Sequence, residues 1–310
     1  MNNTFSSLSK SWRKNKGFLI INITGLAIGL TVSILLLIYV MNEWSYDRHF
    51  TNKDNIVQLN TVWNEEGRSN VQPICTRTAY TELPQNIPGI EKAIQLYRGF
   101  DVEVIHKPER FQKVNLLYSD PGFFDLFNMK FVYGSAGNAL LNPYSAVLTR
   151  QQAEAIYGKI NPVGQTFTIE NAEFTVTAVV EKLPVNTHFN FDILASMKSV
   201  SYLNQMDGLE FFTYFLLDKN MPKEQVCQLI QKNYTASLFK NFSAFNVKFE
   251  SLTIPLTRIH LFSKASWGLS APGSLQSVFL LIGLAFLILL LAITNFVNLF
   301  VVQGNSRSSK

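Results

Sequence analysis

Histidine and cysteine are the side chains here best able to bind a metal or act as nucleophiles, and they lie far apart in the sequence. The four histidines stand at positions 49, 106, 188 and 260, and there is neither an H-x-x-x-H nor a C-x-x-C pattern. Zinc sites usually combine three or four such ligands at short spacings. We therefore predict no metal site and interpret each histidine as a surface or packing residue.

Patterns for nucleotide binding and acyl transfer are also absent from the sequence. There is no G-x-x-x-x-G-K-[ST] segment, so the chain cannot cradle ATP phosphates in a P-loop. The glycine-containing segment 134–137 lacks the lysine and is typical of a turn. No G-x-S-x-G elbow surrounds a serine. We predict no catalytic residue, no cofactor bound by this chain, and no enzymatic activity.

The two cysteines, Cys75 and Cys227, leave two possibilities open. If both face an oxidising compartment, a disulfide is chemically allowed. Cys227 also falls on the apolar side of a predicted helix, where a buried free thiol is ordinary. The sequence favours two free thiols.

Two long uncharged segments bracket the middle of the chain, at residues 17–41 and 278–302. At ~1.5 Å per residue, either helix would exceed the roughly 30 Å hydrocarbon core of a bilayer. A buried core helix is the first alternative, and two runs of this length without charge disfavour it. A cleaved signal peptide is the second, but the first run is longer than a signal core and no small-residue cleavage site follows it. We predict two transmembrane helices.

The charges predict how these spans are oriented. All 22 acidic residues lie between Glu43 and Glu250, whereas four cations precede Gly17 and two follow Val302. Lysine and arginine near membrane ends stay cytoplasmic. We predict an inner-membrane protein with both ends cytoplasmic, a large periplasmic domain over residues 42–277 and a cytoplasmic tail over 303–310. The near-neutral middle argues against nucleic-acid binding, although the pI is near 9.1.

Residues 1–16 have the pattern of an amphipathic helix. Phe5, Leu8 and Trp12 follow an i, i+3, i+7 spacing, and Lys10 and Arg13 lie off that stripe. Such a helix could lie on the cytoplasmic leaflet before the first span. The alternative is a frayed basic tail, and we favour the helix.

Both predicted spans carry small and polar residues on an apolar background. Asn22, Gly25 and Gly29 lie in the first span, and Asn295 and Asn298 in the second. Small residues let helices approach closely, and polar groups in a membrane need partners. We predict that these faces pack against other helices; a substrate path is the alternative.

The middle of the chain has a mixed α+β pattern, large enough for one domain or for two subdomains, and we expect two. The helix over 150–157 would be capped by Thr149 and ended by Gly158, and Pro222 would begin another carrying Val226 and Tyr234. A hairpin is expected to turn at Asn171-Ala172. Strand-like segments occur at 56–63, 101–106, 111–118, 165–170, 173–180, 212–217 and 246–254.

A series of short motifs in this order resembles the MacB/FtsX-type ABC transporter permeases. Each motif alone is weak, but the series extends along nearly the whole chain. The motifs are Asn22-x-x-Gly25-Leu26-Ala27-x-Gly29, Glu43-x-Ser45-Tyr46-Asp47, Asp120-Pro121-x-Phe123-Phe124, Asn142-Pro143, Asn161-Pro162-x-Gly164, His188-Phe189-x-Phe191-Asp192, Ile259-His260-Leu261 and Asn295-Phe296-x-Asn298-Leu299.

The resemblance implies a permease subunit whose periplasmic domain responds to ATP-driven motion. ATP and Mg²⁺ would then be bound by a separate ABC ATPase subunit. A homodimer or a paired permease, membrane lipid and a periplasmic adaptor are the other implied partners. With the small and polar span faces, Glu43, Ser45, Tyr46 and Asp47 are the expected coupling residues. The alternative for Ser45–Asp47 is a helix end with local capping bonds.

Two departures from the family pattern and one rival function complete the predictions. His49-Phe50 stands where the family reads Phe-His, and the chain is shorter, so we expect an N-terminal portion followed by further spans. The rival is a two-span sensor with an external ligand-binding domain, which should continue into a long charged helix. Glycine, asparagine and serine at 303–307 are poor for such a helix and favour the permease. A membrane-anchored enzyme is the third possibility, and no group of catalytic residues in the sequence supports it.

Overall fold

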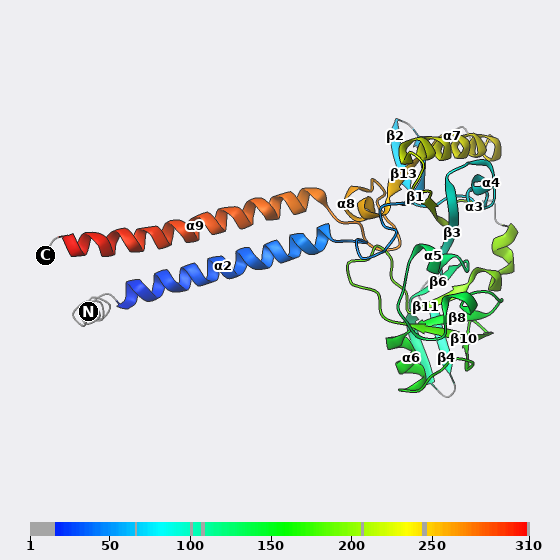
Figure 1. Cartoon of the computed structure of the whole chain (residues 1–310), viewed down its shortest axis with the longest axis horizontal. Helices are drawn as coiled ribbons and strands as arrows, with labels where there is room; N and C mark the ends of the chain where they lie inside the picture. Colours follow the sequence, from blue (N-terminus) through cyan, green and yellow to red (C-terminus); the bar gives the residue numbers. More distant parts are fainter. Residues whose placement is uncertain are drawn as a thin grey trace. The chain divides into compact units, whose positions relative to one another are not determined.

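The computed structural model describes residues 16–65, 67–99, 102–106, 109–205, 208–243 and 247–308. The chain divides into two compact units (Figure 1). Ser45–Gly273 is called the sheet unit, and Met1–Trp44 with Ser274–Lys310 is called the helical unit. The amphipathic helix predicted over 1–16 lies outside the described residues, apart from Lys16.

The helical unit consists of two long helices that pack side by side, α2 (Lys16–Trp44) and α9 (Leu275–Ser308) (Figure 1). They contain the predicted spans 17–41 and 278–302. The candidate spans Ile20–Trp44 and Leu275–Asn298 are 25 and 24 residues long and have mean hydropathies of 2.4 and 2.9, so both are long and apolar enough to cross a membrane. Most of their large apolar side chains are exposed, which is unlike a helix in the core of a globular domain.

Helix α9 continues through the segment that we expected to be unfavourable for a helix. Residues 303–308, including Gly304 and Asn305, are helical. Propensity is a weak preference, and extending an existing helix needs no new nucleus. Our argument against a sensor from this tail was therefore wrong, and the choice of function must depend on other observations.

A mixed sheet runs through the sheet unit, as the α+β prediction requires. Its path is β13-β1-β12-β3-β6-β11-β8-β10-β9-β4-β5, with β2 beside β1 and β7 beside β10. Pairs β8/β10 and β6/β11 are parallel, and the other pairs are antiparallel. The strands are β1 (Ile56–Glu65), β2 (Arg68–Gln72), β3 (Ile90–Arg98), β4 (Val102–His106), β5 (Glu109–Val114), β6 (Leu116–Ser119), β7 (Phe131–Tyr133), β8 (Ser145–Thr149), β9 (Thr166–Ile169), β10 (Ala172–Val180), β11 (Ile193–Ser196), β12 (Phe212–Leu217) and β13 (Lys248–Pro255).

Short helices cover the sheet, and two of them follow the sequence signals closely. Helix α6 begins after Thr149, whose hydroxyl accepts a hydrogen bond from Gln152 N, and it ends at Gly158 with φ of 72°. Helix α7 begins directly after Pro222. The helices are α3 (Arg77–Thr81), α4 (Leu83–Asn86), α5 (Phe123–Leu126), α6 (Arg150–Tyr157), α7 (Lys223–Asn241) and α8 (Ile259–Phe262), with 3₁₀ turns η1 (Ala136–Asn138), η2 (Met197–Ser199), η3 (Ser201–Gln205) and η4 (Leu256–Arg258).

The buried side chains form large clusters along one continuous sheet, and Ser45–Gly273 is one compact unit, so the two subdomains that we expected are not separate units. One cluster packs phenylalanine rings from distant segments against one another. The Phe50 and Phe127 ring centroids lie 5.0 Å apart, and those of Phe127 and Phe189 lie 4.9 Å apart. Offset and edge-to-face ring pairs of this kind stabilise beyond their buried area.

Two details of the strand predictions were wrong. The single strand expected over 111–118 is two strands, β5 and β6, interrupted at Asn115. Asn115 leaves the ladder because its backbone N and side-chain Nδ2 donate to Asp192 Oδ2, at 3.0 and 3.1 Å. The β9–β10 hairpin is present, but its turn is Glu170–Asn171, with φ of 48° and 72°. Two residues with positive φ match the twist of a tight hairpin.

Candidate functional site

The chain enters the sheet unit through three residues, Ser45, Tyr46 and Asp47, which we call the junction segment. Asn186 holds both sides of this segment. Its Nδ2 donates to Ser45 Oγ at 2.8 Å and to Ser45 O at 3.2 Å, and its carbonyl accepts from Asp47 N at 2.9 Å. The segment is therefore fixed to the loop between β10 and β11.

Asp47 is fully buried, with 0% exposure, and has a left-handed backbone with φ of 59°. Aspartate is one of the few non-glycine residues that tolerates this conformation. Its Oδ1 accepts from His188 N at 3.1 Å and from His188 Nδ1 at 2.9 Å. Among the described residues, none donates a hydrogen bond to Asp47 Oδ2. The buried carboxylate thus depends on one residue, His188.

The hydrogen-bond chain continues from His188 into the middle of the sheet. His188 Nε2 and Tyr214 Oη lie 2.8 Å apart, and Gln58 Nε2 donates to Tyr214 Oη at 3.1 Å. Tyr214 Oη therefore bridges Gln58 and His188. The chain links the junction segment to β12 and β1.

An aspartate, a histidine and a hydroxyl in line have the order of a hydrolytic triad, but this hydroxyl cannot reach a substrate. Tyr214 has 0% exposure, and burial followed by the nearby Asp47 charge raises its pKa well above the usual value. A nucleophile needs access and an accessible anionic form. Of the His, Cys, Asp and Glu residues in the described part of the chain, no three lie together as metal ligands. The hydrogen bonds from Asp47 through His188 to Tyr214 therefore support a structural role, which is to link the junction segment to the sheet.

Tyr46 and the residue that ends the sheet unit both contact His260. The Tyr46 and His260 rings stack with centroids 3.4 Å apart and planes 3° from parallel. Gly273 N donates to His260 O at 2.8 Å. A Cβ at Gly273 would lie 2.5 Å from His260 Nε2, so this close approach requires glycine. The chain therefore enters and leaves the sheet unit against the same histidine.

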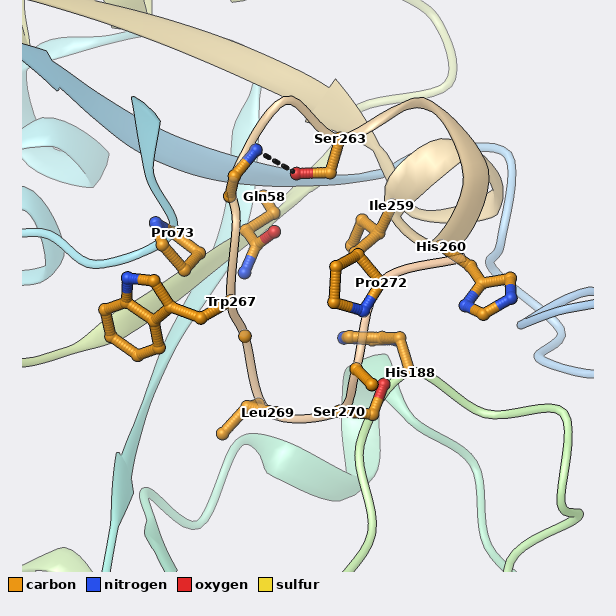
Figure 2. Close-up of a pocket in the computed structure, with 13 residues that line it drawn as sticks. Gln58, Pro73, His188, Ile259, His260, Ser263, Trp267, Leu269, Ser270 and Pro272 are labelled. Atoms are coloured by element: carbon orange, nitrogen blue, oxygen red, sulfur yellow. Dashed lines mark hydrogen bonds between the residues drawn. The ribbon is translucent and has the colours of Figure 1, made fainter. Parts of the chain in front are cut away.

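A narrow cavity lies between the two histidines, His188 and His260, and the loop at residues 263–272 (Figure 2). Gln58, His188 and His260 supply polar groups to its wall, and Trp267 lies at one end. Its volume of about 20 Å³ admits roughly one water molecule. It is too small for an organic substrate, so the site is built to hold the two chain ends and not to bind a ligand of drug-like size.

Within the helical unit, four of the predicted residues lie between α2 and α9. Asn295 Nδ2 donates to Asn22 O at 3.2 Å. A Cβ at Gly25 would lie 3.2 Å from Asn295 Nδ2, and one at Gly29 would lie 2.9 Å from Ala292 Cβ. Glycine at these positions permits the close helix approach that a small-xxx-small pair predicts.

The remaining predicted residues are placed differently. Asn298 is exposed on α9. Glu43 is half-buried in the last turn of α2. The bonds of Ser45 and Asp47 reach Asn186 and His188, 141 positions away, and Ser45 O also accepts a local hydrogen bond from Arg48 N at 3.2 Å, so the junction segment combines long-range bonds with a local turn.

Sequence reasoning missed the partners of the junction segment. We interpreted every histidine as a surface or packing residue, which does not describe His188, whose two ring nitrogens bond Asp47 and Tyr214. His188 and His260 stand in the motif series, and that was the available signal. Asn186 and Tyr214 carried none, because their partners are remote in sequence.

Both cysteines are free, so the disulfide that the sequence allowed is not formed. Cys75 is fully buried, and its thiol donates to Leu59 O at 3.1 Å. Burial raises the pKa of this thiol to about 12. It is an unreactive packing residue, as buried cysteines away from positive charge usually are.

A family model described as MacB-like periplasmic core domain matches residues 19–232. Among solved structures, a domain of a Porphyromonas gingivalis protein described as a permease has a TM-score of 0.58 at 18% identity, covering 67% of this chain and 92% of that chain. At this identity the likeness shows the fold alone. No curated protein matches the sequence.

Two further solved structures are similar over comparable lengths. The periplasmic region of MacB from Actinobacillus actinomycetemcomitans has a TM-score of 0.48 at 17% identity, covering 67% of this chain and 91% of that one. The extracellular domain of the noncanonical ABC-type transporter YknZ from Gram-positive bacteria has a TM-score of 0.49 at 10% identity, covering 64% and 100%.

Proposed function

The chain belongs to the family of proteins with a MacB-like periplasmic core domain, and from this premise we propose that it is the permease subunit of an ABC transporter complex. In such a complex ATP and Mg²⁺ are bound and ATP is hydrolysed by a separate ATPase subunit. The permease works as a homodimer or beside a second permease. Its task is to carry the motion that ATP drives to the periplasmic domain.

The proposed topology places the sheet unit in the periplasm. Helices α2 and α9 cross the inner membrane, and both of their distal ends are cytoplasmic. The six cations outside the acid-bearing middle of the chain support this orientation, because lysine and arginine next to spans stay inside. The sheet unit is then joined to the membrane at Ser45 and at Gly273.

The observation that carries the proposal is that every residue of the junction segment is bonded to, or packed on, the rest of the sheet unit. Each of its three residues is fixed to a different group: Ser45 to Asn186, Tyr46 to His260 and Asp47 to His188. A flexible linker would absorb a helix displacement. Because the first residue after α2 is already hydrogen-bonded to the sheet unit, a shift of α2 must either displace the 186–188 loop or break these bonds.

The displacement then has a defined path. His188 moves with Asp47 and is bonded to Tyr214 in β12, which is bonded to Gln58 in β1. Packed strands move as rigid bodies and do not deform continuously. His260 contacts both ends of the sheet unit, because its ring stacks on Tyr46 and its carbonyl accepts from Gly273 N. A motion of α2 relative to α9 would therefore act on His260.

A two-span sensor remains the second candidate, and the helical α9 through Ser308 is the observation that favours it. A sensor would pass a ligand signal inward along that helix. The family match favours the permease.

The test measures ATP-driven motion at the sheet unit. The full chain is purified from its native membrane, and a P-loop ATPase is expected to co-purify. A fluorophore at Asn190→Cys, an exposed position two residues beyond His188, should change its emission when ATP and vanadate are added. Two glycines inserted between Trp44 and Ser45 should abolish this change and leave co-purification intact. The matched control inserts two glycines after Gly137, where a Cβ meets no atom within 4 Å.

One result contradicts the permease, and another contradicts the path through the junction segment. If a histidine kinase co-purifies in place of an ATPase, the sensor is correct. If the ATPase co-purifies but the insertion at the junction leaves the response unchanged, the motion does not pass through Ser45–Asp47.

A further inference from the structure

The loop held against the junction segment ends in an exposed apolar tip, Pro184–Val185. Val185 is 81% exposed, and Pro184 beside it is exposed as well. Leu183 immediately before the tip is buried. A single exposed apolar residue is ordinary, but two in succession at a loop tip need an explanation when the loop is rigid.

The apolar tip is fixed in shape on both sides. Thr187 Oγ1 donates to Pro184 O at 2.8 Å and closes the turn. The next residue after Val185 is Asn186, whose amide bonds Ser45. These two hydrogen bonds hold the loop in one conformation. The apolar side chains at the tip therefore cannot leave the water by a movement of the loop.

The covalent structure fixes how far the tip can lie from the end of α2. Ser45 follows Trp44, the last residue of α2, and Asn186 Nδ2 lies 2.8 Å from Ser45 Oγ. Val185 is one residue, about 3.8 Å, from Asn186. The headgroup layer of a bilayer adds roughly 5–8 Å to each side of the hydrocarbon core. If α2 spans the membrane, the tip lies within reach of that layer.

A second exposed apolar side chain belongs to the other element that holds the junction segment. Phe262 closes α8, whose His260 stacks on Tyr46, and it is 43% exposed. The Arg258 guanidinium carbon lies 5.4 Å from the centroid of the Phe262 ring. At a membrane surface an arginine can keep its charged end at the phosphates while its apolar stem packs beside an aromatic ring.

The charges around these two sites suit an anionic surface. Two cations are exposed, Arg258 and Lys182, and Lys182 Nζ also donates to Gln151 Oε1 at 3.2 Å. The neighbouring acids are engaged, because Asp47 is fully buried and Glu181 pairs with Arg150 at 2.6 Å. Exposed cations beside apolar side chains bind membranes that carry acidic headgroups.

We propose that Pro184–Val185 and Phe262 enter the headgroup layer of the periplasmic leaflet, with Arg258 on lipid phosphate. The inference rests on the proposed function only in requiring that α2 spans the membrane. The bilayer then contacts the sheet unit at the 184–188 loop and at α8, the two segments that bind the junction segment. The packing and the charge of the lipids would therefore influence the position of these two segments.

The experiment uses depth-dependent quenching in the full chain. Single cysteines replace Val185, Phe262, Trp44 and Ile160 in a Cys227→Ser background, and each is labelled with an environment-sensitive fluorophore. Cys75 is retained because it is buried and its pKa of about 12 makes it unreactive. The protein is reconstituted in vesicles of phosphatidylcholine and phosphatidylglycerol, with and without brominated acyl chains. Position 44 reports the span, and Ile160, which is 58% exposed, is the matched apolar control.

The inference expects brominated lipid to quench labels at 185 and 262 nearly as strongly as at 44, and several-fold more than at 160. Omitting phosphatidylglycerol should weaken quenching at 262 when Arg258 is present and have no effect in Arg258→Gln. Quenching at 44 without quenching at 185 overturns the inference and leaves the span intact. Absence of quenching at both overturns the span as well. A label at 185 shielded from both brominated lipid and aqueous iodide is covered by protein, which also overturns the inference.

Discussion

His188 Nδ1 and Asp47 Oδ1 lie 2.9 Å apart although 141 residues separate them in the chain. One residue stands three positions after the end of α2, and the other stands between β10 and β11. A buried carboxylate is costly unless it is paired, so this bond fixes the junction segment in one position. The contribution of this bond to the free energy of unfolding, and its coupling to the bond between His188 and Tyr214, can be measured separately.

Replacing Asp47 with alanine should destabilise the chain by about 3 kcal/mol, because the backbone and ring N–H groups of His188 lose their acceptor while buried. Asp47→Asn should cost less, since the amide oxygen can accept both bonds and asparagine tolerates a positive φ. The free energy of unfolding in denaturant, followed by tryptophan fluorescence in detergent, distinguishes the two variants. Asp54→Ala, at an exposed position, is the control.

An equal loss for the alanine and asparagine variants of Asp47 would show that the amide oxygen of asparagine does not replace the carboxylate as the acceptor for the two N–H groups of His188.

Removing the phenol oxygen of Tyr214 should destabilise the chain by about 1–3 kcal/mol, because Tyr214→Phe leaves Gln58 Nε2 and His188 Nε2 without their shared partner. The effect should not add to that of Asp47→Ala, since both act through His188. A double-mutant cycle on unfolding free energies measures the interaction. Strict additivity would show that the two bonds are independent and that no continuous path joins the junction segment to β12.

How much of the fold was predictable depended on how local each signal was. Thr149 and Gly158 bound α6 as predicted, because a cap and a left-handed stop depend on a few neighbouring residues. Strands β8 (Ser145–Thr149) and β11 (Ile193–Ser196) were missed, because short fully buried segments show no alternation. Asn115 broke a strand because of Asp192, a partner 77 residues away.

The candidate site shows the same division. Gly25 and Gly29 are recognisable as a packing pair from spacing alone, since a helix places them on one face. Asp47 was selected with its neighbours as a coupling residue, but its partner His188 could not be identified. The pairing depends on the β10–β11 loop reaching the first residues after α2, and no short-range pattern encodes that contact.

Asp120 should make the stability of the chain depend on pH between about 4 and 6. Burial raises its pKa to about 6 from 3.8, against the opposing hydrogen bond from Gln95 N at 3.1 Å. Because the folded pKa is raised, this contribution is full below the unfolded pKa and is lost as the pH rises through 6. Asp120→Asn should therefore stabilise the protein at neutral pH, by up to about 3 kcal/mol, and flatten this part of the profile.

The matched control for this profile is Asp125→Asn, whose carboxylate is half exposed and pairs with Lys92. It should leave the pH dependence in that window unchanged. A wild-type stability that is flat from pH 4 to 6, or an Asp120→Asn variant that is less stable than wild type at neutral pH, would show that the Gln95 bond outweighs the cost of burial.

The α2–α9 interface makes a prediction opposite in sign to helix propensity. Leucine favours a helix over glycine by about 0.8 kcal/mol. A Cβ at Gly29 would nevertheless lie 2.9 Å from Ala292 Cβ, so Gly29→Leu should force the helices apart. Ser33 Oγ lies 3.2 Å from Ala285 O, so a cysteine pair at 33 and 285 should cross-link on oxidation in membranes. Gly29→Leu should lower the yield several-fold, and Gly283→Leu, where a Cβ meets nothing within 4 Å, should not. Equal yields in both variants would mean that α2 and α9 do not pack through Gly29.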